Sequence, residues 1–315
     1  MSLLLLVPLA AAETVSLRFD PSAGAATAPM RCTGDREQRR GPQNATVHTE
    51  LRVVPEVAPT GKRWAIGTRE LQVLSVTVEP PPPPGAPALD ALLAQLEPAM
   101  PRYLVDAKGR WKGVDAYDAG AIEALFVSSL VAANLPSGQV ERMRPLLTAT
   151  LGPEPLAARL REDWYAHVGH WLGRELTVGR SELGVAKKNE PFAEGTALTW
   201  SASRRVPCGD TGGDTGGDTG GTACVELRLE ARLPDAIVEE ETTTRMAGIA
   251  RAAGIELGEI GFESGSSVTT WISVVDPATL AATSTSRRRV TDAQLSIGGR
   301  DVGMGTVDVM GCVAE

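Results

Sequence analysis

The most informative absence in this sequence is that of catalytic and cofactor motifs. No Gly-x-Ser-x-Gly elbow, Walker loop or dinucleotide glycine fingerprint occurs in its 315 residues. Only 3 histidines are present, so few imidazoles are available to a catalytic or metal site. We therefore expect no nucleotide-dependent chemistry and no cofactor.

Basic clusters are also missing. The formal net charge is −8 at pH 7, and the largest groups of Lys and Arg are Arg39-Arg40 and Arg287–Arg289. Binding a phosphate backbone needs many cations gathered on one surface. Nucleic-acid binding is therefore not expected, and we interpret Arg287–Arg289 as the solvated edge of a strand.

Long apolar runs are absent too. The longest, Leu3 to Leu9, is far shorter than the roughly 20 residues that span a bilayer. It is followed by Ala10-Ala11-Ala12, and the two together are typical of a signal peptide with an A-x-A cleavage site. We expect residues 1–12 to be removed and 13–315 to be periplasmic or secreted. No basic residue precedes the run, so the alternative is a cytosolic chain with an apolar first strand.

Four cysteines remain after that cleavage, and an even number in an exported chain predicts disulfides. Cys208 and Cys224 flank a glycine-rich loop between two alternating segments, so a bridge between them would close the neck of a hairpin. By elimination Cys32 would pair with Cys312; free buried thiols are the alternative. The apolar face of the hairpin consists of Leu198, Trp200, Ala202, Val225, Leu227, Leu229 and Ala231.

The loop of this hairpin holds three tandem Asp-Thr-Gly-Gly copies, in residues 210–221. Asp-Thr-Gly is also the active-site triplet of aspartic proteases, but there a strand holds each Asp beside a second carboxylate. Here each Asp follows glycine, and the period of four differs from the nine of calcium-binding β-roll repeats. We predict a disordered low-complexity loop at 209–223.

Strand patterns lie at both ends of the chain and helical patterns in the middle. This order predicts an α+β fold with a largely antiparallel sheet, in a single domain over 13–315. The Pro-rich residues 80–87 are interpreted as a surface loop, with a domain linker as the alternative. The expected strands are Thr14–Phe19, Ala45–Val54, Trp64–Val78, Tyr103–Val105, Arg110–Gly113, Ser267–Val275, Leu280–Arg289 and Val302–Val313.

Five segments have the sequence pattern of helices. Asp118–Ala133 is interpreted as amphipathic, and Pro234-Asp235 opens a helix with glutamates in its early turns. The expected helices are Ala88–Met100, Asp118–Ala133, Ser137–Thr150, Glu154–Leu172 and Asp235–Ala253. The strand tryptophans Trp64, Trp111, Trp200 and Trp271 are interpreted as core anchors.

Two hairpins carry a resemblance to known proteins. Tyr103–Val114 turns at Asp106-Ala107-Lys108-Gly109, and Trp271–Arg289 turns at Asp276-Pro277-Ala278-Thr279. This layout resembles uncharacterised bacterial secreted proteins and, more distantly, the curved-sheet envelope domains of the LolA/LppX kind. The resemblance covers about half of the chain and implies a half-barrel over an apolar ligand such as a lipid. The chain departs from it in lacking a lipobox and in its large helical middle.

One group of residues is a candidate metal site. Asp163, His167 and His170 fall at i, i+4 and i+7 of the helix expected over Glu154–Leu172, so they would share one helical face. A carboxylate and two imidazoles with that spacing are candidate zinc ligands. Plain surface contacts between His and Asp are the alternative.

Two main functional hypotheses follow. The first is a non-enzymatic envelope or secreted binding module, with an apolar cavity between the sheet and the helices Asp118–Ala133 and Glu154–Leu172. The second is a metal-dependent hydrolase that uses Asp163, His167 and His170. A structural surface protein is a third alternative.

Overall fold

The computed structural model describes residues 13–22, 28–40, 43–81, 101–115, 117–132, 136–208, 223–254 and 260–315. The signal peptide expected at 1–12 and the helix expected at Ala88–Met100 lie outside these residues. So do nearly all of the Pro-rich and repeat loops, at 82–87 and 209–222.

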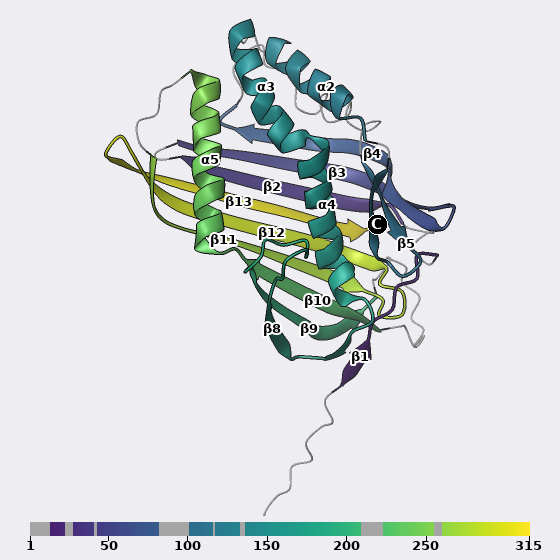
Figure 1. The fold of residues 1–315 in the computed structure, drawn as a ribbon. Helices are drawn as coiled ribbons and strands as arrows, with labels where there is room; N and C mark the ends of the chain where they lie inside the picture. Colours follow the sequence, from purple (N-terminus) through teal and green to yellow (C-terminus); the bar gives the residue numbers. More distant parts are fainter. Residues whose placement is uncertain are drawn as a thin grey trace, which may run out of the picture.

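A single large antiparallel sheet dominates the fold. Its strands are β2 (Met30–Arg40), β3 (Gln43–Thr60), β4 (Arg63–Glu79), β5 (Arg102–Asp106), β6 (Trp111–Asp115), β8 (Ser181–Val185), β9 (Ala197–Pro207), β10 (Ala223–Arg232), β11 (Ile260–Val275), β12 (Ala282–Ile297) and β13 (Arg300–Ala314). The 11 strands follow the order β6-β5-β4-β3-β2-β13-β12-β11-β10-β9-β8. A separate two-stranded sheet pairs β1 (Thr14–Ser16) with β7 (Glu175–Thr177). The sheet is curved, and the helices cover one of its faces (Figure 1), which confirms the predicted α+β class.

The covering helices are α2 (Ala119–Ala132), α3 (Ser137–Leu151), α4 (Pro153–His167) and α5 (Asp235–Ala253). Helix α5 begins after Pro234 and ends at Gly254, whose φ of 70° allows its N–H to bond the carbonyls of Ala250 and Arg251. The proline and the glycine in the sequence therefore mark both ends of this helix correctly.

Two predictions about the helices were wrong in detail. The helix expected over Glu154–Leu172 ends at His167, because Val168 leaves helical geometry (φ −133°) and Gly169–Trp171 form a separate 3₁₀ turn. Helix α2 is not amphipathic, because its sequence AGAIEALFVSSLVA places apolar residues around the whole circumference.

Residues directly opposed on antiparallel strands share a face of the sheet, so one row can be followed across it. Trp271 lies opposite Leu229 on one side and Arg287 on the other. The row continues to the far strands through Met310, Gly34, Thr49 and Val76. We call the face that carries this row the inner face, because the Trp271 indole Nε1 donates a hydrogen bond to Asp163 of α4.

The main core lies where α4 meets the inner face of β9 to β11, and it extends to Val105 of β5 with Trp64 and Ile66 of β4 packed against it. The predicted hairpin is confirmed, since β9 and β10 pair with Ala202 opposite Leu227 and Trp200 opposite Leu229. Leu229 and Trp271 are 0% and 1% exposed. The four strand tryptophans all belong to this core or pack against it, as predicted.

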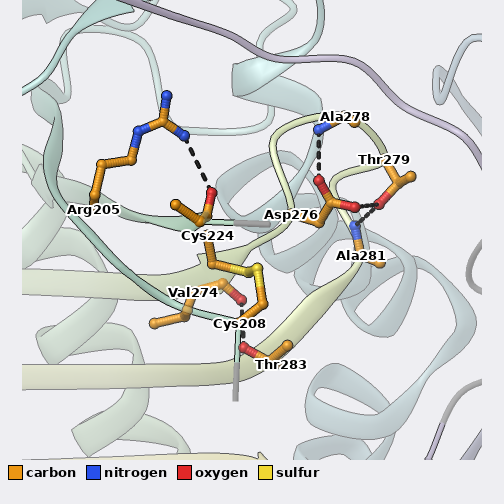
Figure 2. The surroundings of a disulfide bond; sticks show 10 residues. Arg205, Cys208, Cys224, Val274, Asp276, Ala278, Thr279, Ala281 and Thr283 are labelled. Carbon is orange, nitrogen blue, oxygen red and sulfur yellow. Dashed lines mark hydrogen bonds between the residues drawn. A yellow bond between two sulfur atoms is a disulfide. The ribbon is translucent and has the colours of Figure 1, made fainter. Parts of the chain in front are cut away.

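Two disulfides link the strands, and they join the same cysteines that the sequence pairs. Cys32–Cys312 connects directly opposed residues of β2 and β13. Cys208–Cys224 closes the end of the β9–β10 hairpin (Figure 2). Beside it, Arg205 donates to the carbonyl of Ala223.

The Asp276 turn near the hairpin disulfide also follows the sequence prediction (Figure 2). One carboxylate oxygen of Asp276 accepts from the Ala278 N–H at 2.8 Å, and the other accepts from the Thr279 hydroxyl at 3.2 Å. Such a local side-chain bond is the reason Asp favours the first position of a turn.

The two disulfides are expected to differ in their effect on stability. Cys32–Cys312 spans 280 residues and Cys208–Cys224 spans 16. In the chain-entropy model the stabilisation by a disulfide grows with the length of the loop it closes, to about 6 kcal/mol for the first and about 3 kcal/mol for the second. Urea denaturation of the two double Cys→Ala variants measures this difference. A larger loss for the variant at 208 and 224 would contradict the expectation.

Candidate functional site

The three residues predicted as metal ligands do not converge. Because α4 ends at His167, His170 leaves the helical face that Asp163 and His167 share. Across the described ranges, no three His, Cys, Asp or Glu side chains are grouped so that they would hold a metal ion.

Asp163 points from α4 to the inner face of the sheet. Its carboxylate accepts from Arg287 at 3.0 Å and from the Trp271 indole at 3.1 Å. One turn later, His167 Nδ1 lies 2.6 Å from the Ser273 hydroxyl. Burial lowers the pKa of His167 to about 4, against the opposing effect of the Asp163 carboxylate. Both residues therefore hold α4 against β11 and β12.

His170 lies in a different environment, on the 3₁₀ turn. Its ring makes edge-to-face contacts with Tyr165, Trp171 and Trp200. Nδ1 is 3.3 Å from the Tyr165 hydroxyl, and the buried Nε2 has no hydrogen-bond partner among the described residues. Burial, and secondarily the Arg174 cation, lower the pKa of His170 to about 3. The imidazole is therefore neutral and acts as a core ring.

A polar network extends from Asp163 along the inner face. Arg287 also approaches Asp308 of β13 at 3.9 Å, and Arg289 pairs with Glu241 of α5 at 3.1 Å. Burial, and then the Asp163 charge, raise the pKa of Glu162 to about 7. The network therefore attaches both α4 and α5 to β12.

The interpretation of Arg287–Arg289 as a solvated edge was wrong. Strand β12 lies inside the sheet, and side chains alternate along it, so Arg287 and Arg289 point to the helices while Arg288 is exposed on the other face. The period-two spacing of Arg287 and Arg289 was the signal in the sequence that could have identified them.

The inner face has two halves that differ in burial. Over β9 to β11 its side chains are in the core, whereas Met310 of β13 is 49% exposed. Further along, β3 and β4 pair aliphatic residues directly, such as Leu51 with Val73 and Val47 with Val78. We call this aliphatic surface the open half, because its members are only half-buried: Val47, Leu51, Val53, Leu71, Val73, Val76 and Val78.

Helix α2 lies at the β4 end of the sheet, on the same side as α4 (Figure 1). Ile122 is buried, while Phe126 and Val127 remain partly exposed and Ala121 and Ala124 are exposed. An apolar helix and an apolar sheet surface are thus both incompletely buried at this end of the molecule.

Two surface depressions are present elsewhere. One, of about 310 Å³, is lined mainly by residues of the outer face near Cys312. The other, of about 320 Å³, lies beside α4 and the β5–β6 hairpin. The second is lined by residues of the expected helix Glu154–Leu172, but neither is lined by residues of Asp118–Ala133, so neither is the predicted cavity between the sheet and both helices.

Comparison with known proteins identifies no family. No family model matches the chain, and no curated protein is significantly similar to it. Among solved structures, one described as lipid–protein interactions in lipovitellin is similar over 92% of this chain and 25% of that chain, with 8% identity and a TM-score of 0.40. This chain spans a quarter of that structure, and a likeness at this level establishes neither a family nor a ligand. Within the described part of the chain, no helix has the length and apolar composition needed to cross a bilayer.

Raising the pH is expected to destabilise the fold through Glu162. Its folded-state pKa of about 7 lies above the ordinary 4.5, so the unfolded chain loses this proton first and stability falls between those values. Glu162→Gln removes the effect. We expect the free energy of unfolding of the variant, relative to that of wild type, to be about 1–2 kcal/mol higher at pH 8 than at pH 5, after allowance for the partial exposure of Glu162. Thermal midpoints of both proteins at pH 5 and pH 8 test this. The expectation would be contradicted if the midpoint of the variant differed from that of wild type by the same amount at both pH values.

Lowering the pH is expected to act through His170. Its folded-state pKa of about 3 lies below the ordinary 6.5, so the unfolded chain takes up the proton first and stability is lost as the pH falls below about 6.5. His170→Phe keeps a ring in the aromatic contacts without a titratable nitrogen. Between pH 8 and pH 4 the free energy of unfolding of the variant should fall by about 2 kcal/mol less than that of wild type. Equal losses in denaturant titrations would show that His170 is not the responsible group.

Proposed function

We propose that this protein is an extracytoplasmic, non-enzymatic binding module that holds an apolar ligand, such as the acyl chain of a lipid, against the open half. The observation that carries the proposal is the change along the inner face, from a filled core at β9–β11 to half-buried aliphatic side chains at β3–β4.

The two faces of β3 and β4 support an apolar ligand. Their outer face carries polar side chains, including Glu50, Arg52, Glu70, Gln72 and Thr77, whereas the inner face is aliphatic. Exposed aliphatic surface is costly in water, at about 25 cal/mol per Å². Contiguous apolar surface that a fold leaves accessible commonly marks a ligand or partner site.

The network under α4 supports the site mechanically. Asp163 is bonded by Arg287 and Trp271, and His167 by Ser273, so these polar groups are engaged with one another. They fix α4 on the sheet, and the Arg289–Glu241 pair fixes α5. This arrangement favours a binding scaffold over the hydrolase alternative.

The disulfides indicate the compartment in which the protein works. Both disulfides join strands of the main sheet, and such bonds persist in oxidising compartments such as the periplasm or the extracellular space. A carrier or receptor of apolar molecules is needed where these must pass through water.

A charge placed on the open half should weaken ligand binding. Val76 and Thr77 are neighbours on β4 that point to the inner and outer faces. Val76→Asp is expected to weaken binding of a fluorescent fatty acid at least about tenfold, which corresponds to 1.4 kcal/mol. Thr77→Asp is the matched control and should bind like wild type. Binding is measured by fluorescence titration.

Mass spectrometry of solvent extracts from the purified protein provides a second readout, in which we expect co-purified lipid. Equal binding by the two Asp variants would move the site away from the open half. Failure of wild type to bind the fatty acid, together with lipid-free extracts, would overturn the proposed function.

A further inference from the structure

A second candidate site lies outside the open half. The depression of about 320 Å³ is formed by the β5–β6 hairpin, by α4, and by the segment at 189–191. Its size falls at the lower end of the range for small-molecule pockets, about 300–1,000 Å³. It therefore suits a ligand of one or two rings.

Aromatic rings form one wall of this cleft, from Trp111, Trp164 and Tyr165. One face of Trp111 is covered by Tyr103, which stacks on it with a centroid distance of 5.4 Å and an interplanar angle of 21°. Trp111 nevertheless stays partly exposed. A supported, partly exposed indole offers a rigid apolar surface to the flat side of a ligand ring.

Planar polar groups also line the cleft, from Arg161, Asn189 and Glu190, and we call them its rim. Arg161 donates from Nη2 to the backbone carbonyl of Asn189 at 2.9 Å, which positions both residues. Asn189 has a φ of 75°, a conformation in which Asn is among the few tolerated side chains. Glu190 accepts the Lys187 N–H at 3.0 Å. Guanidinium, amide and carboxylate groups together supply several donors and acceptors within one small volume.

The two cations in the lining of the cleft, Arg110 and Arg161, both already have partners. Arg110 is paired with Asp106 at 2.8 Å. Burial opposes ionisation of Asp106, but hydrogen bonds from Arg110, Lys108 and Lys112 lower its pKa to about 2, so the carboxylate stays charged. Arg161 and Glu190 carry opposite charges in the same lining. Because these cations are engaged and a carboxylate lies in the same lining, the cleft offers little attraction to an anion.

We propose that this cleft binds a neutral sugar ring, with a C–H face of the sugar on the aromatic wall and its hydroxyls on the rim. Sugars combine an apolar face with closely spaced hydroxyl donors and acceptors, and the cleft offers the complementary groups. The site is separate from the open half and does not depend on the proposed apolar ligand.

The test uses the full protein and three uncharged probes: the β-1,4-linked tetramers of glucose and N-acetylglucosamine, and an α-linked tetramer of mannose. Titrations are followed by tryptophan fluorescence and by calorimetry. We expect saturable binding of at least one probe with a Kd at or below about 1 mM.

Two variants locate the site. Asn189→Gly removes the side-chain amide and suits the positive φ, and Arg161→Gln removes the charge on the rim. Each is expected to weaken binding at least about fivefold with an unchanged thermal midpoint. Arg159→Gln, on the exposed side of the same helix and outside the cleft, is the matched control.

Two results would overturn the proposal. The first is no saturable binding of any probe at about 10 mM. The second is equal binding by wild type and both cleft variants. Val76→Asp should leave sugar binding unchanged. This separates failure of the sugar site from failure of the apolar site, since each has its own probe and its own variants.

Discussion

The pairing of β2 with β13 is the interaction on which the rest of the structure depends. The two strands come from opposite ends of the chain, and their ladder runs from Met30 opposite Ala314 to Arg40 opposite Met304. On one side of this joint lie β3 to β6 and on the other β12 back to β8. The Cys32–Cys312 disulfide lies within the same ladder and reinforces it covalently.

A sheet of this width needs its inner face covered, and the helices cover it unevenly. Helix α4 packs on β11 and β6 and is attached through Asp163 to β12 and through His167 to β11, while Glu241 links α5 to Arg289. These attachments use polar groups that would be costly if left unpaired in the interior. The aliphatic side chains of the open half, on β3 and β4, are only half-buried beside this core.

Local patterns in the sequence were sufficient for several elements. The β9–β10 hairpin followed from its alternating apolar residues, the turn at Asp276 from its side-chain hydrogen bonds, and α5 from Pro234 and Gly254. Other elements carried no such signal. Strand β2 has the sequence MRCTGDREQRR, without an apolar alternation, and it forms because β3 and β13 bond to it on both sides.

The candidate sites, too, depend partly on local sequence and partly on contacts between distant residues. The sequence placed Asp163, His167 and His170 on one helical face, but the helix ended at His167 because Gly169–Trp171 pack as a separate turn in the aromatic core. The partners Arg287 and Ser273 lie more than a hundred residues from α4, at sequence separations of 124 and 106. No local pattern links such distant residues.

The sequence by itself determined the antiparallel α+β class, the hairpin and its apolar face, and the residues of most helices, since each depends on short-range periodicity, turn chemistry or helix termini. The tertiary structure alone decided the strand order, the joining of the two ends at β2 and β13, the role of Arg287 and the partial burial of the open half. These depend on which distant segments meet, and that is set by burial summed over the whole chain and by backbone hydrogen bonds between strands far apart in the sequence.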